Sequence, residues 1–171
     1  MGTEPDDQAR FISSTKLQTS ISTDLDKLAG TDPFDIISLW HVLEHIPDLS
    51  QAILQIHDLL TTEGTLLIAV PNSDSYDAGY FREYWAAYDV PRHLYHFTPS
   101  TIELLFRNYG FSLIEQKPMA FDALYIAMLS TRYQTGTTDY LKSIKIGMKS
   151  NAKAKRTGHS SSMTYVFRKS N

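Results

Sequence analysis

The stretch from Phe34 to His45 constrains the fold most strongly. It reads FDIISLWHVLEH, an apolar run that breaks into a polar turn holding two histidines and a glutamate. A largely apolar strand is typical of a parallel sheet that is covered on both faces. In such sheets ligands bind beyond the carboxyl ends of the strands. The sequence therefore predicts a buried strand over residues 34–39 and a ligand site in the turn that follows it.

The next segments complete a strand–helix–strand unit. Asp48 precedes a helix and Gln51 stands at its third position, an arrangement that caps helix N-termini. The buried stripe of this helix recurs at helical spacing and consists of Leu49, Ile53, Ile56 and Leu60. Residues 65–70, TLLIAV, form a second apolar strand. Such a unit has a right-handed crossover and indicates an α/β fold.

Local patterns predict the remaining elements. A helix is expected from residue 98, because Thr98 is a favoured N-cap and Pro99 a favoured first helical residue. Further strands are expected near residues 17–23, 111–116 and 163–168, and further helices near residues 5–14, 121–133 and 140–156.

Residues 73–97 connect two elements and are rich in aromatic and ionisable side chains. A connection of that length inside one domain is usually functional. We expect a lid with one short helix near residues 80–88. Within it, His93 or His96 can take a proton from a nucleophile, and Arg92 can hold an anion. The alternative is that both histidines only pin the lid by hydrogen bonds.

Composition narrows the class of protein. The 171 residues contain no cysteine, which excludes disulfides and thiolate metal sites, and no apolar run of about 18 residues that would span a membrane. A cytoplasmic protein is expected. The net charge of -3 hides a basic carboxyl-terminal part, with nine Lys or Arg and one acid from Arg132 onward. The basic helical segment, residues 134–160, is either a solvated face or a surface for an anionic polymer, lipid or partner.

The turn after the first strand invites a metal hypothesis. His41, Glu44 and His45 lie within one helical turn, but their order differs from the H-E-x-x-H pattern of zinc proteases. We therefore expect no metal there, and a metal hydrolase using His41, His45 and His93 is a third hypothesis. The sequence also contains no G-x-G and no G-x-S-x-G motif.

Three segments together resemble class I S-adenosylmethionine-dependent methyltransferases of the ubiquinone-biosynthesis O-methyltransferase-like group. They are residues 35–48 (DIISLWHVLEHIPD), residues 64–72 (GTLLIAVPN) and residues 89–99 (DVPRHLYHFTP). The resemblance extends over about residues 1–116.

The resemblance implies an α/β, Rossmann-like sheet of strand order 3-2-1-4-5-7-6 in which only the last strand is antiparallel. On this chain the first strand and its glycine-rich loop would be absent, so residues 1–171 would form a single, partial methyltransferase domain. The strands beside the gap would have unpaired edges, which invite pairing with another copy of the chain.

The resemblance also assigns roles to individual residues. S-adenosylmethionine would be held by Glu4, Asp24, Leu25, Trp40 and His41. The acceptor would contact Tyr84, Trp85, Arg92 and Tyr95, with His93 and His96 as catalytic residues. The expected function is methyl transfer to a small molecule rather than to a nucleic acid. The alternative is a non-catalytic binding module that uses the basic helix.

Overall fold

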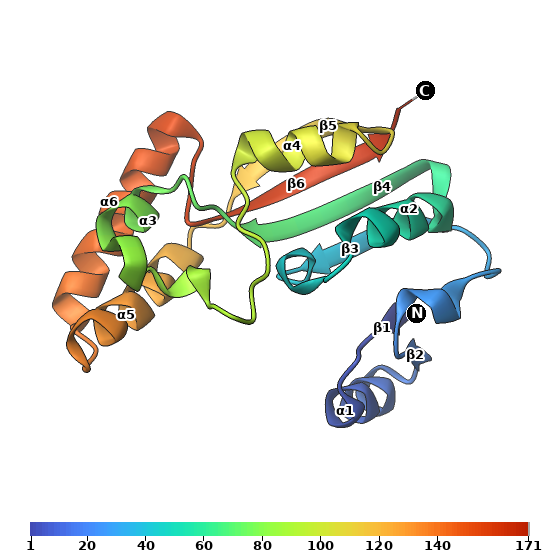
Figure 1. The fold of residues 1–171 in the computed structure, drawn as a ribbon, viewed down its shortest axis with the longest axis horizontal. Coiled ribbons are helices and arrows are strands. Elements are labelled where there is room, and N and C mark those ends of the chain that lie inside the picture. The colour runs from blue at the N-terminus through green and yellow to red at the C-terminus, as the bar shows by residue number, and fades with distance from the viewer. Residues whose placement is uncertain (171) are drawn as a thin grey trace.

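The computed structural model describes residues 1–170, and its main feature is a four-stranded mixed sheet (Figure 1). The strands lie in the order β3 (Phe34–Trp40), β4 (Leu60–Pro71), β6 (Ser162–Lys169) and β5 (Phe111–Pro118). β3 and β4 are parallel, whereas β6 is antiparallel to both of its neighbours. The order and the antiparallel last strand confirm the predicted α/β, Rossmann-like arrangement.

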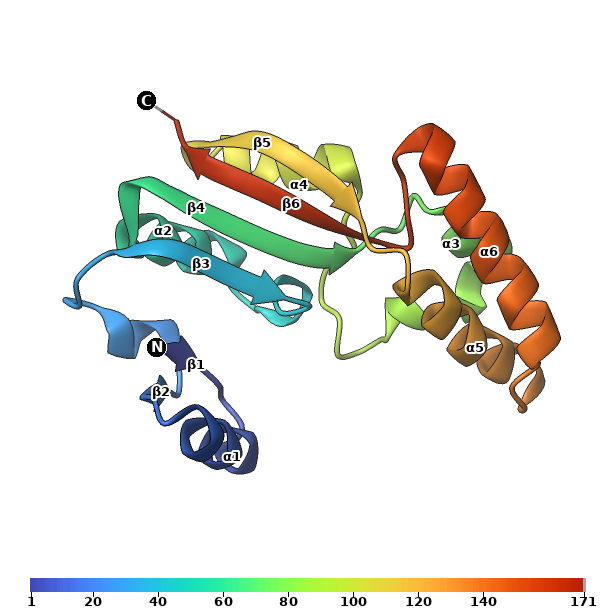
Figure 2. The same cartoon turned by 180° about the vertical axis from the view of Figure 1, so that it is seen from behind.

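A smaller two-stranded sheet lies beside the free edge of β3 (Figures 1 and 2). Its parallel strands are β1 (Gly2–Thr3) and β2 (Ile21–Ser22), joined by α1 (Asp7–Leu17) and followed by the 3-10 helix η1 (Leu25–Leu28). No strand pairing joins the two sheets among residues 1–170. A cavity of about 380 Å³ lies between them, lined by Thr3 and Leu25 on one side and by Ile36 and Ser38 on the other.

Two helices, α2 (Leu49–Leu59) and α4 (Pro99–Arg107), cover one face of the larger sheet (Figure 1). Both begin at the predicted caps: Asp48 accepts a hydrogen bond from the Gln51 amide, and Thr98 forms a reciprocal pair with Thr101. The main core lies beneath these helices. On the other face, Ile36 is 64% exposed and Trp40 is 54% exposed. The expectation that this strand is covered on both faces is therefore wrong for the described residues.

Three further helices gather beyond the carboxyl end of β4: α3 (Tyr76–Phe81), α5 (Asp122–Thr135) and α6 (Tyr140–Thr157) (Figure 1). The lid starts with α3 and continues through two 3-10 turns, η3 (Arg82–Tyr84) and η4 (Ala86–Tyr88). The single helix predicted for residues 80–88 is thus replaced by shorter turns. The Trp85 ring lies between these turns and is buried against α5 and α6.

Helix α6 packs on α5 through small residues. Ser143 Oγ donates to the Ala127 carbonyl of α5, and a Cβ on Gly147 would lie 2.7 Å from the Leu124 side chain. Apolar residues at helical spacing on the opposite side of α6 face outward, since Leu141 is 84% exposed and Met148 is 63% exposed. Among the described residues no helix is both long enough and apolar enough to cross a membrane.

Candidate functional site

A cavity of about 360 Å³ lies where the ends of β3 and β4 meet the lid and α5. We call it the edge cavity. Its wall is formed by the residue after β3, the end of β4, the lid and one side of α5, through residues that include His41, Pro71, Asp89, Arg92, His93, Asp122, Tyr125 and Tyr133. It occupies the predicted position beyond the carboxyl ends of parallel strands.

His41 follows β3 directly and adopts a positive φ of 52°, which turns its side chain out of the strand. Its Nε2 lies 3.2 Å from Asp122 Oδ2, and its Nδ1 lies 3.4 Å from Glu44 Oε1. The Asp122 carboxylate, and after it that of Glu44, raises the pKa of His41 to about 9, although burial acts in the opposite direction. The imidazole is therefore charged at neutral pH and acts as a cation rather than as a base.

Asp122 is the counterpart of this charge. Burial acts to raise its pKa, but the interaction with His41 prevails and the pKa of Asp122 is lowered. The pair thus places one positive and one negative charge side by side on the cavity wall.

Glu44 lies in the short 3-10 helix η2 (Leu43–His45) and is fully buried. Neither of its carboxylate oxygens has a hydrogen-bond partner. The contact with His41 Nδ1 is within ion-pair range but lacks hydrogen-bond geometry. A buried carboxylate without donors is costly, so Glu44 is the most unusual polar group of the site.

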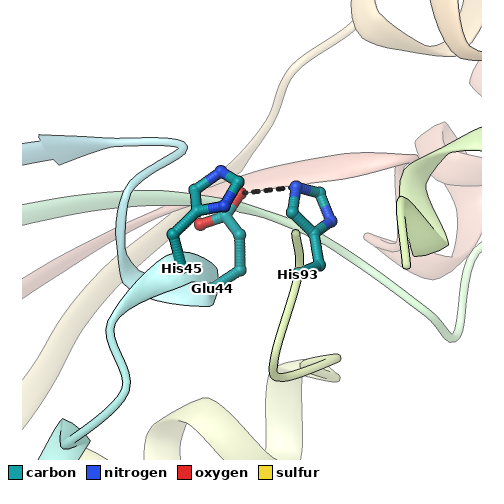
Figure 3. A group of neighbouring side chains, drawn as sticks. All are labelled: Glu44, His45 and His93. Carbon is teal, nitrogen blue, oxygen red and sulfur yellow. Dashed lines mark ion pairs between the residues drawn. The ribbon is translucent and has the colours of Figure 1, made fainter. Parts of the chain in front are cut away.

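His93 reaches toward Glu44 from the lid, as Figure 3 shows. Its Nδ1 lies 2.8 Å from the Ala87 carbonyl oxygen. Because a carbonyl only accepts, Nδ1 carries a hydrogen, and Nε2 is the atom that has the lone pair in the neutral imidazole. Nε2 lies 4.0 Å from Glu44 Oε1 and 3.9 Å from Asp89 Oδ2.

Arg92 and Asp89 form the rim of the lid beside His93. Arg92 Nη2 donates to Asp89 Oδ1 over 2.6 Å. The hydrogen bond to Asp89 raises the pKa of the Arg92 guanidinium, which therefore stays charged. The structure thus brings the predicted residues His41, Arg92 and His93 together around one cavity.

The other predicted lid residues lie outside the cavity wall. His96 is exposed and its Nε2 lies 3.0 Å from the Tyr88 carbonyl oxygen, while the Tyr95 hydroxyl donates to the Pro47 carbonyl. The buried Trp85 ring donates from Nε1 to Asp77. Tyr84 lies in η3 and is partly exposed. These four side chains fasten or flank the lid in this structure.

The predicted cofactor residues are divided between two places. Glu4 and Asp24 stand just after the parallel strands β1 and β2, Leu25 lines the cavity between the sheets, and Trp40 ends β3. Asp24 caps η1, and its pKa is lowered chiefly by a hydrogen bond from the Thr23 hydroxyl. Carboxylates at adjacent strand ends fit the ribose hydroxyls of a nucleoside. The residues present therefore fit the adenosine side of S-adenosylmethionine.

The sequence did not reveal the importance of Glu44, Asp122 or Tyr125. Glu44 carried one signal, its place between His41 and His45 in the turn after the first strand. Asp122 and Tyr125 belong to α5, and no local pattern connects that helix with the end of β3.

Comparison with known proteins supports the assignment of this fold. The family model described as a methyltransferase domain matches residues 2–116. The chain belongs to the methyltransferase domain family. No curated protein matches it. The match covers most of the chain and includes β3, β4, the lid and α4.

Solved structures show the same fold at low sequence identity. A SAM-dependent methyltransferase from Thermotoga maritima is 13% identical, with a TM-score of 0.63; the alignment covers 99% of this chain and 72% of that one. An S-adenosylmethionine-dependent methyltransferase from Clostridium acetobutylicum is 8% identical, with a TM-score of 0.59 and coverages of 99% and 74%.

A third similar structure contains a ligand related to the predicted cofactor. It is 1,6-didemethyltoxoflavin-N1-methyltransferase from Burkholderia thailandensis with bound 1,6-didemethyltoxoflavin and S-adenosylhomocysteine, and it is 18% identical with a TM-score of 0.54. The alignment covers 98% of this chain but only 58% of that protein. The chain thus corresponds to about two thirds of a methyltransferase of this fold.

Proposed function

We propose that this chain contributes to S-adenosylmethionine-dependent methyl transfer to a small-molecule acceptor that binds in the edge cavity. The observation that carries the proposal is the His93 imidazole, which lines a cavity at the carboxyl edge of a methyltransferase sheet and is held through Nδ1 by the Ala87 carbonyl, so that Nε2 is the atom left to accept a proton. The family match and the S-adenosylhomocysteine in a protein of the same fold support the choice of cofactor.

Glu4, Asp24, Leu25 and Trp40 are the residues proposed to hold the cofactor, whereas His41, which the resemblance also assigns to the cofactor, lines the edge cavity. Glu4 would accept hydrogen bonds from the ribose hydroxyls, Asp24 would lie by the adenine amine with Leu25 beside the ring, and Trp40 would line the methionine part. When bound, S-adenosylmethionine supplies a methyl group activated by its sulfonium centre. All other contributions come from the side chains of the protein.

In the edge cavity, His93 Nε2 would take the proton of the attacking group as the general base. The charged His41 and Arg92 would orient an anionic part of the acceptor, while Tyr125 and Tyr133 provide flat walls. An oxygen nucleophile on an aromatic, acidic molecule fits this set, in keeping with the ubiquinone-biosynthesis O-methyltransferase-like group. His96, Tyr84, Trp85 and Tyr95 would hold the lid in place around the acceptor.

Titration calorimetry with S-adenosylhomocysteine tests the cofactor half of the proposal. We expect micromolar binding to the unaltered chain, and Asp24→Asn should weaken it about tenfold because a charged hydrogen bond is lost. Asp58→Asn is the matched control, since Asp58 is exposed at the end of α2. Absence of binding at millimolar ligand would show that this chain does not bind the cofactor by itself.

A methyl-transfer assay tests the catalytic half. With radiolabelled S-adenosylmethionine and a panel of hydroxylated aromatic acids, His93→Gln should lower kcat by roughly 10²-fold or more while S-adenosylhomocysteine affinity stays unchanged. If His93→Gln had the same kcat as the unaltered chain, His93 would not be the general base.

A second candidate function rests on α6. Between Tyr140 and Thr157 the helix contains no acid, and it presents Leu141 and Met148 on its exposed side next to Lys145. Apolar and basic side chains on one exposed face fit an anionic lipid surface. We expect sedimentation with phosphatidylglycerol vesicles but not with phosphatidylcholine vesicles. Leu141→Gln should reduce it, whereas Leu54→Gln on α2 should not; equal sedimentation of both variants would dismiss this candidate.

The free edge of β3 also leaves pairing with a second copy of the chain as a proposal. Light scattering coupled to size exclusion measures the mass directly. A monomer at micromolar concentration would rule out a stable pair.

A further inference from the structure

We propose that Glu44, His45 and His93 form a binding site for a divalent transition-metal ion. Each residue offers one ligand atom, and the three atoms lie within 4.8 Å of one another. They come from two segments: η2 provides Glu44 and His45, and the lid provides His93 (Figure 3). Two imidazoles and a carboxylate are a ligand set that zinc, manganese and iron(II) proteins use.

The state of Glu44 is the independent observation behind this inference. Its carboxylate is fully buried and neither oxygen accepts a hydrogen bond. Buried charges in proteins are paired with opposite charge or coordinate metals. His41 lies 3.4 Å from Oε1 only, so Oε2 is left without a partner that the protein provides. A cation between Glu44 and the two imidazoles would supply one.

The two imidazoles are anchored as metal-binding histidines usually are. The Nδ1 of His93 donates to the Ala87 carbonyl, and the Nδ1 of His45 lies 3.0 Å from the Arg92 carbonyl oxygen. Contacts of this kind fix the ring orientation of metal ligands. The rings of His45 and His93 stand edge to face with centroids 4.6 Å apart. Asp89 Oδ2, 3.9 Å from His93 Nε2, is placed to add a second carboxylate.

Small movements would complete the geometry. In a tetrahedral site with bonds of about 2.0 Å, neighbouring ligand atoms lie about 3.3 Å apart. The ligand atoms that lie furthest apart would therefore have to approach by up to about 1.5 Å. His45 is exposed and has room to move, whereas Glu44 is fixed by burial. The positive charge of His41 opposes a nearby cation, but the Asp122 carboxylate at 3.2 Å offsets it.

The inference concerns the same cavity wall as the proposed methyl transfer, and it alters the role of one residue. With the ion bound, His93 Nε2 is a ligand and no longer the base; coordination would then lower the pKa of an acceptor hydroxyl. Metal binding is measured without cofactor or acceptor. Either proposal can therefore fail while the other stands.

Calorimetric titration of the chelator-treated chain with zinc chloride tests the site, together with the visible absorption of the cobalt(II) form. We expect one zinc ion per chain with micromolar or tighter affinity. Glu44→Gln and His93→Gln should each weaken binding by at least about tenfold. His57→Gln is the matched control, because His57 lies on α2 and packs against Phe111.

Thermal unfolding followed by circular dichroism shows whether each variant is folded. His45→Gln serves if a variant at a buried position unfolds, since His45 is exposed. Absence of stoichiometric zinc binding at millimolar metal would overturn the inference. So would binding that Glu44→Gln and His57→Gln change equally.

Discussion

Two carboxylates of this protein are equally buried but differ in the hydrogen bonds that they accept. Asp77 on α3 and Glu44 in η2 both have no exposed surface. Asp77 accepts three hydrogen bonds, from Trp85 Nε1 at 2.8 Å, Ser150 Oγ at 2.7 Å and Ser161 Oγ at 2.6 Å. Glu44 accepts none. Burial alone therefore does not distinguish a structural acid from a functional one, whereas the presence of donors does.

The neighbouring side chains of each acid indicate its role. The donors of Asp77 come from the lid, from α6 and from the loop before β6, so one carboxylate fastens three distant segments. The neighbours of Glu44 are three histidines, and neutral imidazoles are the commonest metal ligands in proteins. Asp77 thus holds the lid to the helices, and Glu44 keeps unused binding capacity next to the edge cavity.

The largest effect is expected from Asp77→Ala. The change leaves a buried indole N–H and two buried hydroxyls without their acceptor, which should lower the free energy of unfolding by about 3–5 kcal/mol. Asp77→Asn should lose less than half of that, because an amide can still accept from Trp85 and donate to both serine oxygens. Equilibrium urea unfolding measures both variants. A loss below about 1 kcal/mol for Asp77→Ala would contradict the fastening role.

A smaller loss is expected from Ser150→Ala, which removes one donor and keeps the other two. Hydrogen bonds to a charged acceptor contribute about 1.5–3 kcal/mol, and the value should lie at the low end because Ser161 and Trp85 remain. The same urea experiment measures it, with Ser14→Ala as the control, since Ser14 bonds only to the Phe11 carbonyl on the isolated α1. If Ser150→Ala and Ser14→Ala lowered the free energy of unfolding equally, the hydrogen bond from Ser150 to Asp77 would add no more stability than a bond within an exposed helix.

Sequence patterns predicted those parts of the fold that neighbouring residues specify. Asp48 with Gln51, and Thr98 with Pro99, marked the starts of α2 and α4, and the apolar runs marked β3 and β4. Each signal lies within a few residues of its effect. The order of the strands in the larger sheet came from the family resemblance, and the structure confirms it.

Contacts between distant segments could not be predicted in the same way. The partner of His41 is Asp122 on α5, and the donors to Asp77 include Ser161, 84 residues away. The exposed apolar residues of α6 are another example. Hydrophobic periodicity predicted the helix, but it did not predict which face of the helix packs against α5. Small residues such as Gly147 decide that face, since they allow α5 to approach closely.

The smallest effect on stability is expected from Glu44→Gln, measured by urea unfolding in the presence of a chelator. Gln has the same shape but no charge, so the variant loses the attraction of His41 and avoids the cost of a buried carboxylate without donors. These opposing contributions should leave the free energy of unfolding within about 1 kcal/mol of the unaltered chain. If Glu44→Gln instead lost as much as Asp77→Ala, Glu44 would be a structural acid held by His41. A near-zero change in stability together with the loss of zinc affinity would show the opposite, that the protein maintains this buried charge for what it binds.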